Sequence, residues 1–381
     1  MKNDEKRIFL SSPTMNGHEM KYIQEAFDSN WIAPLGKNVD EFEREMAYYI
    51  GVNGASALSA GTAALHLAVK LAGVGQEDVV LSSSLTFAAT CNPVAYEKGK
   101  LVFIDSEKDT WNMSPDALEE GIKKYPHAKA VILAHLYGTP AHIDEIKNIC
   151  EKHSVILIED AAEALGSTYK GKKCGSFGKY GILSFNGNKI ITTSGGGMLL
   201  SDQEEDIEKS RFWATQAREP ARHYEHKEIG YNYRMSNIVA GIGRGQLLTL
   251  DEYMKKKQDI YKGYKEAFSD IEEIQMNPLN AYGKANNWLS CITLSPACIR
   301  GGVTPMAIMD ALANDNIESR PIWKPMNLQP VFSECDFIQT ESENGVSIGE
   351  DIFNRGLCLP SDIKNSEEDM RRIIEIIKGM F

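Results

Sequence analysis

Short apolar runs alternate with longer amphipathic stretches between about residues 56 and 202. Most positions in these runs are apolar or small, and the runs are ALSA, DVVLSSS, LVFID, AVILAHLYG, VILIED, GILSFN and GGMLLS. Runs of this length are typical of central parallel strands covered on both faces, and the stretches between them have helical periodicity. This part of the chain is therefore predicted to be an α/β/α layered sandwich around a mainly parallel sheet.

The pattern changes after residue 202. A polar, aromatic segment spans residues 211–237, a helical stretch follows over 247–268, and the remainder is a mixture of strand and helix patterns. A chain of 381 residues is too long for one ordinary core. We therefore predict a large domain over residues 1–249 and a smaller C-terminal α/β domain over residues 250–381.

Composition and charge narrow the class of protein. Hydrophobic residues make up 43% of the chain, and the net charge of -12 disfavours a broad surface for nucleic acid or anionic membranes. No apolar run is long enough to span a bilayer and no leader pattern is present, so a cytoplasmic location is expected. The seven cysteines lack C-x-x-C spacing, which predicts free thiols.

Candidate chemistry begins at the stretch ALSAGTAALHLAVKLAG, where a strand ends and a helix starts within a few residues. The first backbone N–H groups of this helix, with the Thr62 hydroxyl, can bind a phosphate. The alternative is that Gly61 and Thr62 only cap the helix. The chain lacks G-x-x-x-x-G-K-[ST] and G-x-G-x-x-G, which disfavours a nucleoside triphosphatase and an NAD-dependent oxidoreductase.

Three further residues follow predicted strands. Asp160 ends one strand and can hold a protonated ring nitrogen, or it caps a helix. Phe87 can stack on a flat cofactor, or it belongs to the core. Lys189 lies in SFNGNKIITTSGGGML and can form an imine with an aldehyde, or it is a solvated lysine on a turn. Together with the phosphate cradle, these residues describe a site for pyridoxal phosphate.

The sequence resembles the DegT/DnrJ/StrS family of fold-type-I, pyridoxal-phosphate-dependent sugar aminotransferases. The resemblance runs from residue 10 to residue 361 and depends on SAGTAAL, LTFAAT, EDAAEALGS, SFNGNKIITTSGGGML, ATQARE, GYNYRMSNI and SRPIWKPM. It implies an imine at Lys189, an Asp160 contact to the ring nitrogen, and a homodimer in which Asn232 reaches the neighbouring subunit's phosphate. The implied cofactor contacts are Gly61, Thr62, Phe87, Asp160, Glu163, Ser184, Asn186, Lys189 and Asn232.

Within that family the chain looks closest to C4 aminotransferases of UDP-4-keto-6-deoxy-N-acetylglucosamine, enzymes of bacillosamine synthesis. NWIAPLG, AHLYG and HYEHKEIGYNYR carry this resemblance. It implies L-glutamate as amino donor and a ping-pong reaction. Candidates for holding the nucleotide sugar are Trp31, Arg211, Arg218, His223, Arg320, Trp323 and Lys324. Trp323 can stack and Arg320 can pair with phosphate, although these two side chains can equally belong to a subunit interface.

Two positions depart from the family pattern, and some alternatives stay open. Glu163 occupies a place where many relatives have Gln or His, and Asn327 one where we associate His. The alternatives are amination of a dTDP-linked or 3-keto sugar, and a non-catalytic regulator; Lys189 disfavours a dehydratase. His223 and His226 flank Glu225 without a convincing third ligand, so no metal site is predicted.

Overall fold

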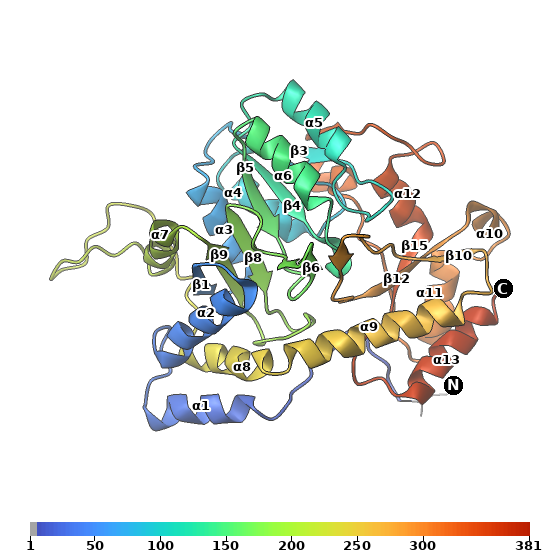
Figure 1. The fold of residues 1–381 in the computed structure, drawn as a ribbon, viewed down its shortest axis with the longest axis horizontal. Coiled ribbons are helices and arrows are strands. Elements are labelled where there is room, and N and C mark those ends of the chain that lie inside the picture. The colour runs from blue at the N-terminus through green and yellow to red at the C-terminus, as the bar shows by residue number, and fades with distance from the viewer. Residues whose placement is uncertain (1–5) are drawn as a thin grey trace.

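A computed structural model describes residues 6–381, and its central feature is an eight-stranded sheet of order β1-β9-β8-β5-β4-β2-β3-β14 (Figure 1). Its strands are β1 (Gly54–Leu58), β2 (Val79–Ser83), β3 (Lys100–Ile104), β4 (Ala130–Ala134), β5 (Ile156–Asp160), β8 (Tyr180–Ser184), β9 (Gly197–Ser201) and β14 (Asp336–Ile338). The pairs from β8 through β14 are parallel, whereas β9 pairs antiparallel with both β8 and β1. The predicted mainly parallel sheet is confirmed.

Helices cover both faces of this sheet. They are α2 (Lys37–Ile50), α3 (Gly61–Leu71), α4 (Asn92–Tyr96), α5 (Pro115–Lys124), α6 (Ile143–Lys152), α7 (Glu204–Ala214) and α8 (Asn237–Leu247). Helix α1 (Glu19–Asp28) packs on α8 and lies outside this layer (Figure 1). One core contains Phe42 of α2 and Ile146 of α6, and a second contains Leu67 of α3 and Ile207 of α7. Two separate cores, one on each face, are the α/β/α sandwich that the strand pattern predicts.

A smaller antiparallel sheet of order β10-β12-β15-β13 forms the C-terminal part. It contains β10 (Ile274–Met276), β12 (Ser290–Leu294), β13 (Arg320–Pro321) and β15 (Gly356–Leu359), with α10 (Pro296–Arg300), α11 (Pro305–Asn314), α12 (Ile348–Arg355) and α13 (Glu367–Lys378). The short elements are β6 (Thr168–Tyr169), β7 (Lys172–Lys173), β11 (Gly283–Lys284), η1 (Ala88–Thr90), η2 (Leu136–Gly138), η3 (Met326–Leu328) and η4 (Pro330–Phe332).

The long helix α9 (Leu250–Ala267) joins the two parts, as Figure 1 shows. Leu250 and Tyr253 at its start pack in a core of the large sheet, and Tyr264 near its end packs in a third core with the small sheet. The predicted domain boundary at Thr249 falls between α8 and α9. It stays a prediction, because α9 contributes to cores on both sides.

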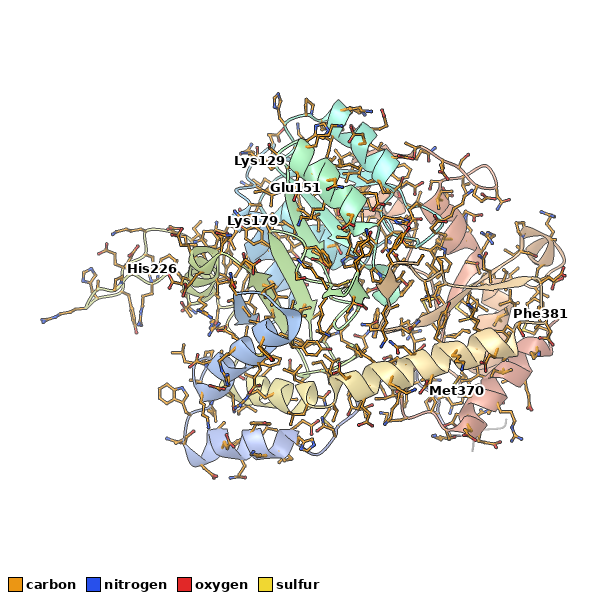
Figure 2. The ribbon with its side chains drawn as sticks, in the orientation of Figure 1. Lys129, Glu151, Lys179, His226, Met370 and Phe381 are labelled. Atoms are coloured by element: carbon orange, nitrogen blue, oxygen red, sulfur yellow. The ribbon has the colours of Figure 1, made fainter. Side chains whose placement is uncertain are left out.

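Residues 217–230, between α7 and α8, form a projection that we call the arm. At the base of the arm, the Gln216 N–H donates a hydrogen bond to the Tyr231 carbonyl (2.9 Å). Figure 2 labels His226 on the arm. Tyr224 and Ile229 expose 79% and 76% of their surface.

None of the seven cysteines forms a disulfide, as predicted. No helix among residues 6–381 has the length and apolar character needed to cross a membrane.

Candidate active site

A cavity of about 440 Å³ lies beyond the carboxyl ends of the central strands, where open α/β sheets bind ligands. Of the residues singled out in the sequence, nine line it: Gly61, Thr62, Phe87, Asp160, Glu163, Ser184, Asn186, Lys189 and Trp323. β5 ends at Asp160, β8 ends at Ser184, and α3 begins at Gly61. The sheet topology therefore brings these side chains to one place from distant parts of the chain.

Lys189 points into the cavity and is largely buried. Its side chain is 14% exposed, and its Nζ lies 3.8 Å from Glu163 Oε1 and 4.0 Å from the centroid of the Trp288 ring. Burial lowers the pKa of the Lys189 amine, whereas the Glu163 and Asp160 carboxylates oppose that shift. The alternative of a solvated lysine on a surface turn is wrong.

Asp160 is buried and held by two hydrogen bonds. Its Oδ2 accepts from the Thr90 hydroxyl (2.7 Å) and its Oδ1 from the Ala162 N–H (3.1 Å). The Thr86 and Thr90 hydroxyl oxygens are 2.7 Å apart, so Thr86 donates to Thr90 while Thr90 donates to Asp160. Burial raises the pKa of the Asp160 carboxyl. No helix follows Asp160 before β6, so the helix-cap alternative is wrong.

Glu163 faces Lys189 with one carboxyl oxygen and is anchored through the other. Its Oε2 accepts from the backbone N–H of Tyr137 (2.7 Å). Burial raises the pKa of the Glu163 carboxyl, and the neighbouring Lys189 opposes that shift. A carboxyl with a raised pKa can carry a proton and donate a hydrogen bond, which an ionised carboxylate cannot do.

The start of α3 forms an open anion cradle beside these groups. Its N-cap is Ala60, and no described side chain caps it, so the first backbone N–H groups are left for a ligand. A Cβ added to Gly61 would lie 3.0 Å from Ser184 Cβ, which shows how closely α3 approaches the end of β8. The cradle therefore offers backbone N–H groups together with the Thr62 and Ser184 hydroxyls.

The aromatic residues of the cavity come from both parts of the chain. Phe87 is 53% exposed, so its alternative role as a core residue is wrong. Its ring lies 5.3 Å from that of Trp323. A second cavity of about 560 Å³ shares Trp288 and Trp323 with the first, and both Arg320 and Lys324 line it. Arg320 forms an ion pair with Glu318 (2.7 Å).

The other candidates for sugar or phosphate contacts do not line the first cavity. Arg211 binds Glu43 at 2.7 Å, and Trp31 is 50% exposed near α1. On the arm, the Arg218 guanidinium lies over the Tyr224 ring, and His223 pairs with Glu225 (3.0 Å). Asn232 lies at the base of the arm, where it pairs with Thr215.

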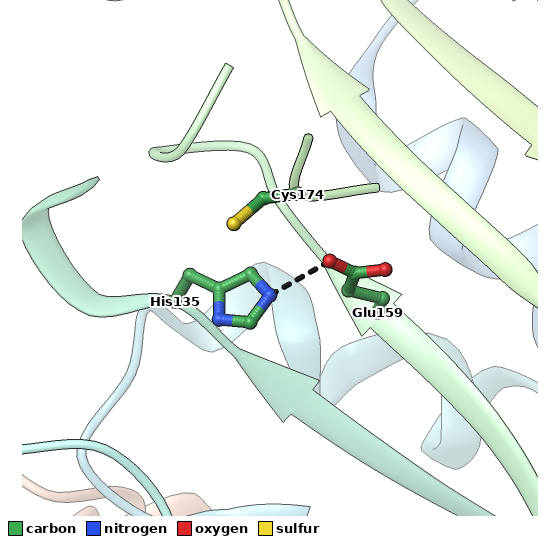
Figure 3. A group of neighbouring side chains, drawn as sticks. All are labelled: His135, Glu159 and Cys174. Atoms are coloured by element: carbon green, nitrogen blue, oxygen red, sulfur yellow. Dashed lines mark hydrogen bonds and ion pairs between the residues drawn. The ribbon is translucent and has the colours of Figure 1, made fainter. Parts of the chain in front are cut away.

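His135, Glu159 and Cys174 form a buried group (Figure 3), and His135 also lines the cavity. Glu159 accepts hydrogen bonds from His135 Nε2 (2.8 Å) and from the N–H groups of Gly175 (2.5 Å) and Phe177 (2.8 Å). His135 Nδ1 accepts from the Ala141 N–H (3.2 Å), so its proton is on Nε2. Burial raises the pKa of the Cys174 thiol. These bonds fix the ends of β4 and β5.

Thr86, Thr90, Tyr137 and Trp288 are among the residues around the cavity that sequence reasoning missed. Thr86 and Thr90 lie in LTFAAT, directly after a predicted strand, and two hydroxyl groups four residues apart at a strand end were an available signal. Tyr137 has a positive φ of 51°, and no local sequence motif predicts this conformation. Trp288 reaches the cavity from just before β12, and only the tertiary fold places it beside Lys189.

Comparison with known proteins agrees with this geometry. The family model of the DegT/DnrJ/EryC1/StrS aminotransferase family matches residues 13–378. EpsN of Bacillus subtilis, named provisionally as a pyridoxal phosphate-dependent aminotransferase, is 50% identical over 99% of this chain and 96% of its own. The GDP-perosamine synthase of Caulobacter vibrioides is 35% identical over 98% of both chains.

Two further proteins extend the comparison. A UDP-4-amino-4,6-dideoxy-N-acetyl-β-L-altrosamine transaminase of Campylobacter jejuni is 37% identical over 68% of this chain and 70% of its own. The crystal structure of the aminotransferase TlmJ from Streptoalloteichus hindustanus superimposes with a TM-score of 0.88 at 26% identity, over 98% of this chain and 99% of TlmJ.

Pyridoxal phosphate is the cofactor of this group of enzymes. The cavity fits it chemically, because one end presents uncapped helix N–H groups for a phosphate and the other presents a largely buried lysine and a buried carboxyl. The match over residues 13–378 and the folded arrangement of the site agree: this chain belongs to the DegT/DnrJ/EryC1/StrS aminotransferase family and is a pyridoxal-phosphate-dependent sugar aminotransferase.

Proposed function

We propose that this enzyme transfers the amino group of L-glutamate to the C4 keto carbon of a UDP-linked 4-keto-6-deoxy-N-acetylhexosamine. The observation that carries the proposal is the burial of Lys189 beside Glu163, in the cavity that also holds Asp160. A relative named as a transaminase of a UDP-linked N-acetylated sugar supports the substrate class. The C4 position and the UDP group rest on the resemblance described above.

We assign the parts of the cofactor to residues by their chemistry. The start of α3 with Thr62 and Ser184 would bind the phosphate, because N–H and O–H donors converge there. Asp160 would hold the ring nitrogen, and Phe87 would stack on the ring. Glu163 and Asn186 would lie at the ring hydroxyl, where the raised pKa of Glu163 allows it to donate.

Pyridoxal phosphate, when bound, supplies an aldehyde that exchanges amino groups and a ring that withdraws electrons from the reacting carbon. Lys189 Nζ would act as the base that removes a proton from the substrate and returns it to another carbon. Burial lowers the pKa of this amine, which increases the neutral fraction that can accept a proton. Glutamate and sugar would use the same lysine in turn, which gives ping-pong kinetics.

The ionisation of Asp160 depends on its partner. Burial alone raises the pKa of this carboxyl, and a cationic ring nitrogen would stabilise the charged form. The hydrogen bonds from Thr90 and the Ala162 N–H aim the carboxylate before any ligand arrives. Such preorganisation lowers the reorganisation cost when charge develops in the ring.

Gly61→Ala is expected to weaken binding of pyridoxal phosphate to the apoenzyme about tenfold, a loss of about 1.4 kcal/mol. The added methyl would lie 3.0 Å from Ser184 Cβ and 3.2 Å from its hydroxyl oxygen, and would push these groups apart at the phosphate cradle. Absorbance titration of the apoenzyme measures the affinity. Gly263→Ala on α9 is the control, since its methyl would meet open space; an unchanged affinity in Gly61→Ala would contradict the cradle assignment.

We also propose a homodimer in which the base of the arm reaches the partner subunit's cavity. Asn232 does not line the cavity of its own chain, and the arm exposes Tyr224 and Ile229. An apolar surface of this kind favours burial against another chain. Asn232 would then contact the partner's cofactor phosphate, while Arg218 and His223 on the arm would approach the partner's nucleotide.

The substrate prediction is tested by a panel of keto sugars with L-glutamate as donor. We expect the UDP-linked 4-keto-6-deoxy-N-acetylhexosamine to give the highest kcat/KM, at least about tenfold above GDP- and dTDP-linked sugars, a difference of about 1.4 kcal/mol. The GDP-linked sugar is the main competitor, because a GDP-perosamine synthase is 35% identical over nearly the whole chain. Equal or faster turnover of a GDP-linked, dTDP-linked or 3-keto sugar would reject the UDP assignment.

A further inference from the structure

Lys257 of α9 is a buried lysine outside the cavity. It is 3% exposed, and its Nζ donates to the Ser11 hydroxyl oxygen (3.1 Å), the Trp288 carbonyl (3.0 Å) and the Ser361 carbonyl (2.6 Å). An ammonium group has three hydrogens, and each has an acceptor here. Lys257 therefore ties together the N-terminal segment, the chain before β12 and the chain after β15.

Two of these partners continue to the loop that carries Lys189. The Ser11 hydroxyl donates to the Asn188 carbonyl (3.0 Å), and the Trp288 indole N–H donates to the same oxygen (2.7 Å). On the other side of this peptide, the Lys189 N–H donates to the Asn186 carbonyl (3.0 Å). Because a peptide unit is planar, bonds on both sides fix the plane from which the Lys189 side chain departs.

We infer that Lys257 is a positioning residue for Lys189, acting through Ser11 and Trp288 on the Asn188 carbonyl. The inference rests on the proposed role of Lys189. Trp288 is connected to Lys189 in two ways. Its indole N–H and its carbonyl belong to the hydrogen-bond network, and the centroid of its ring lies 4.0 Å from Lys189 Nζ. A shift of Trp288 would therefore move the peptide before Lys189 and the surface under its amine together.

Folding alone is a poor explanation for an amine at this place. Burial lowers the pKa of Lys257 to about 7, and the nearby Asp362 carboxylate only partly opposes that shift. Burying an ammonium group costs free energy of folding even when the group is hydrogen-bonded. An apolar side chain of similar length often packs equally well at such a position. What an apolar residue cannot do is orient the Ser11 hydroxyl toward Asn188.

The first test concerns the chain of hydrogen bonds from Lys257 through the Ser11 hydroxyl to the Asn188 carbonyl, which we call the relay. Ser11→Ala removes the middle of this relay without changing the core. Ser29→Ala is the matched control, because the Ser29 hydroxyl also donates to a backbone carbonyl, that of Ala26 (3.1 Å), but lies outside this network. We expect Ser11→Ala to slow covalent capture of pyridoxal phosphate by the apoenzyme, followed by visible absorption, about fivefold, and to lower kcat by a similar factor. The KM for L-glutamate and the thermal midpoint should match those of the control.

The second test connects Lys257 to the same relay. Lys257→Met should slow cofactor capture at least as much as Ser11→Ala, and Lys257→Arg should restore part of the rate because it keeps the charge and the donors. Adding Ser11→Ala to Lys257→Met should cost little more, since coupled residues are not additive. If Lys257→Met does not fold, the comparison of Ser11→Ala with Ser29→Ala decides alone.

Two outcomes overturn the inference. Ser11→Ala and Ser29→Ala with equal capture rates and equal kcat would show that the relay does not act on Lys189. Fully additive losses in the double variant would show that Lys257 acts by another route. If instead the unaltered enzyme does not bind the cofactor covalently at Lys189, the proposed function fails. This failure can be told apart from failure of the inference about Lys257, because it is seen before any variants are compared.

Discussion

Replacing Lys189 by alanine is expected to lower turnover by about 10⁴-fold or more, since a positioned general base alone contributes about 10² to 10⁴. The same change removes the only amine that the described residues place in the cavity. No other lysine among residues 6–381 lines it, so no neighbour can take over the proton transfer. The measurement is kcat with L-glutamate and the preferred keto sugar.

The control for this prediction is Lys179→Ala. Lys179 is a partly exposed lysine just before β8 that pairs with Asp206 (3.5 Å), and it does not line the cavity. We expect it to retain the activity and colour of the unaltered enzyme. Residual activity of Lys189→Ala above about one hundredth of normal would show that another group transfers the proton.

Asp160→Asn is expected to lower kcat by about 10³-fold while the protein stays folded, because one preorganised electrostatic partner is worth about 10² to 10³ in rate. The amide keeps the size of the side chain and can still accept from Thr90 or Ala162. It loses the negative charge that would stabilise a cationic ring nitrogen. Single-turnover kinetics with L-glutamate measure the loss without interference from sugar binding.

The matched control is Asp206→Asn. Asp206 accepts from the Tyr180 hydroxyl (3.0 Å) at the start of β8, the opposite end of the strand from Ser184. It should leave the rate within about threefold of normal, since surface substitutions cost little. A loss of less than about tenfold in Asp160→Asn would mean that the ring nitrogen is held by another group.

The sheet and much of the cavity were predictable because both depend on local signals. Apolar runs of strand length predict buried strands, and the carboxyl ends of parallel strands share one edge of a sheet. Asp160 and Ser184 end such runs, and Gly61 follows another. Their meeting in one cavity follows from topology, whereas their roles toward the cofactor stay predictions until the variants are measured.

Other features depend on contacts between distant segments and could not be predicted. β9 pairs antiparallel because the chain returns directly after β8 without a crossover helix, and β14 joins the sheet edge from the C-terminal part. Trp288 and Lys257 have no motif of their own. The charge run MKKKQ suggests a solvated helix face, yet Lys257 within it is buried against three segments that only the tertiary structure assembles.

The most direct test of the account is to reduce the cofactor-loaded enzyme with borohydride, digest it and locate the added mass by peptide sequencing in a mass spectrometer. Reduction makes the bond between a lysine and the cofactor aldehyde permanent, so the modified residue identifies itself. We predict a single pyridoxyl group on the peptide that contains Lys189. A modified peptide from elsewhere in the chain, or no modification of an enzyme that is active with the cofactor, would contradict the central claim.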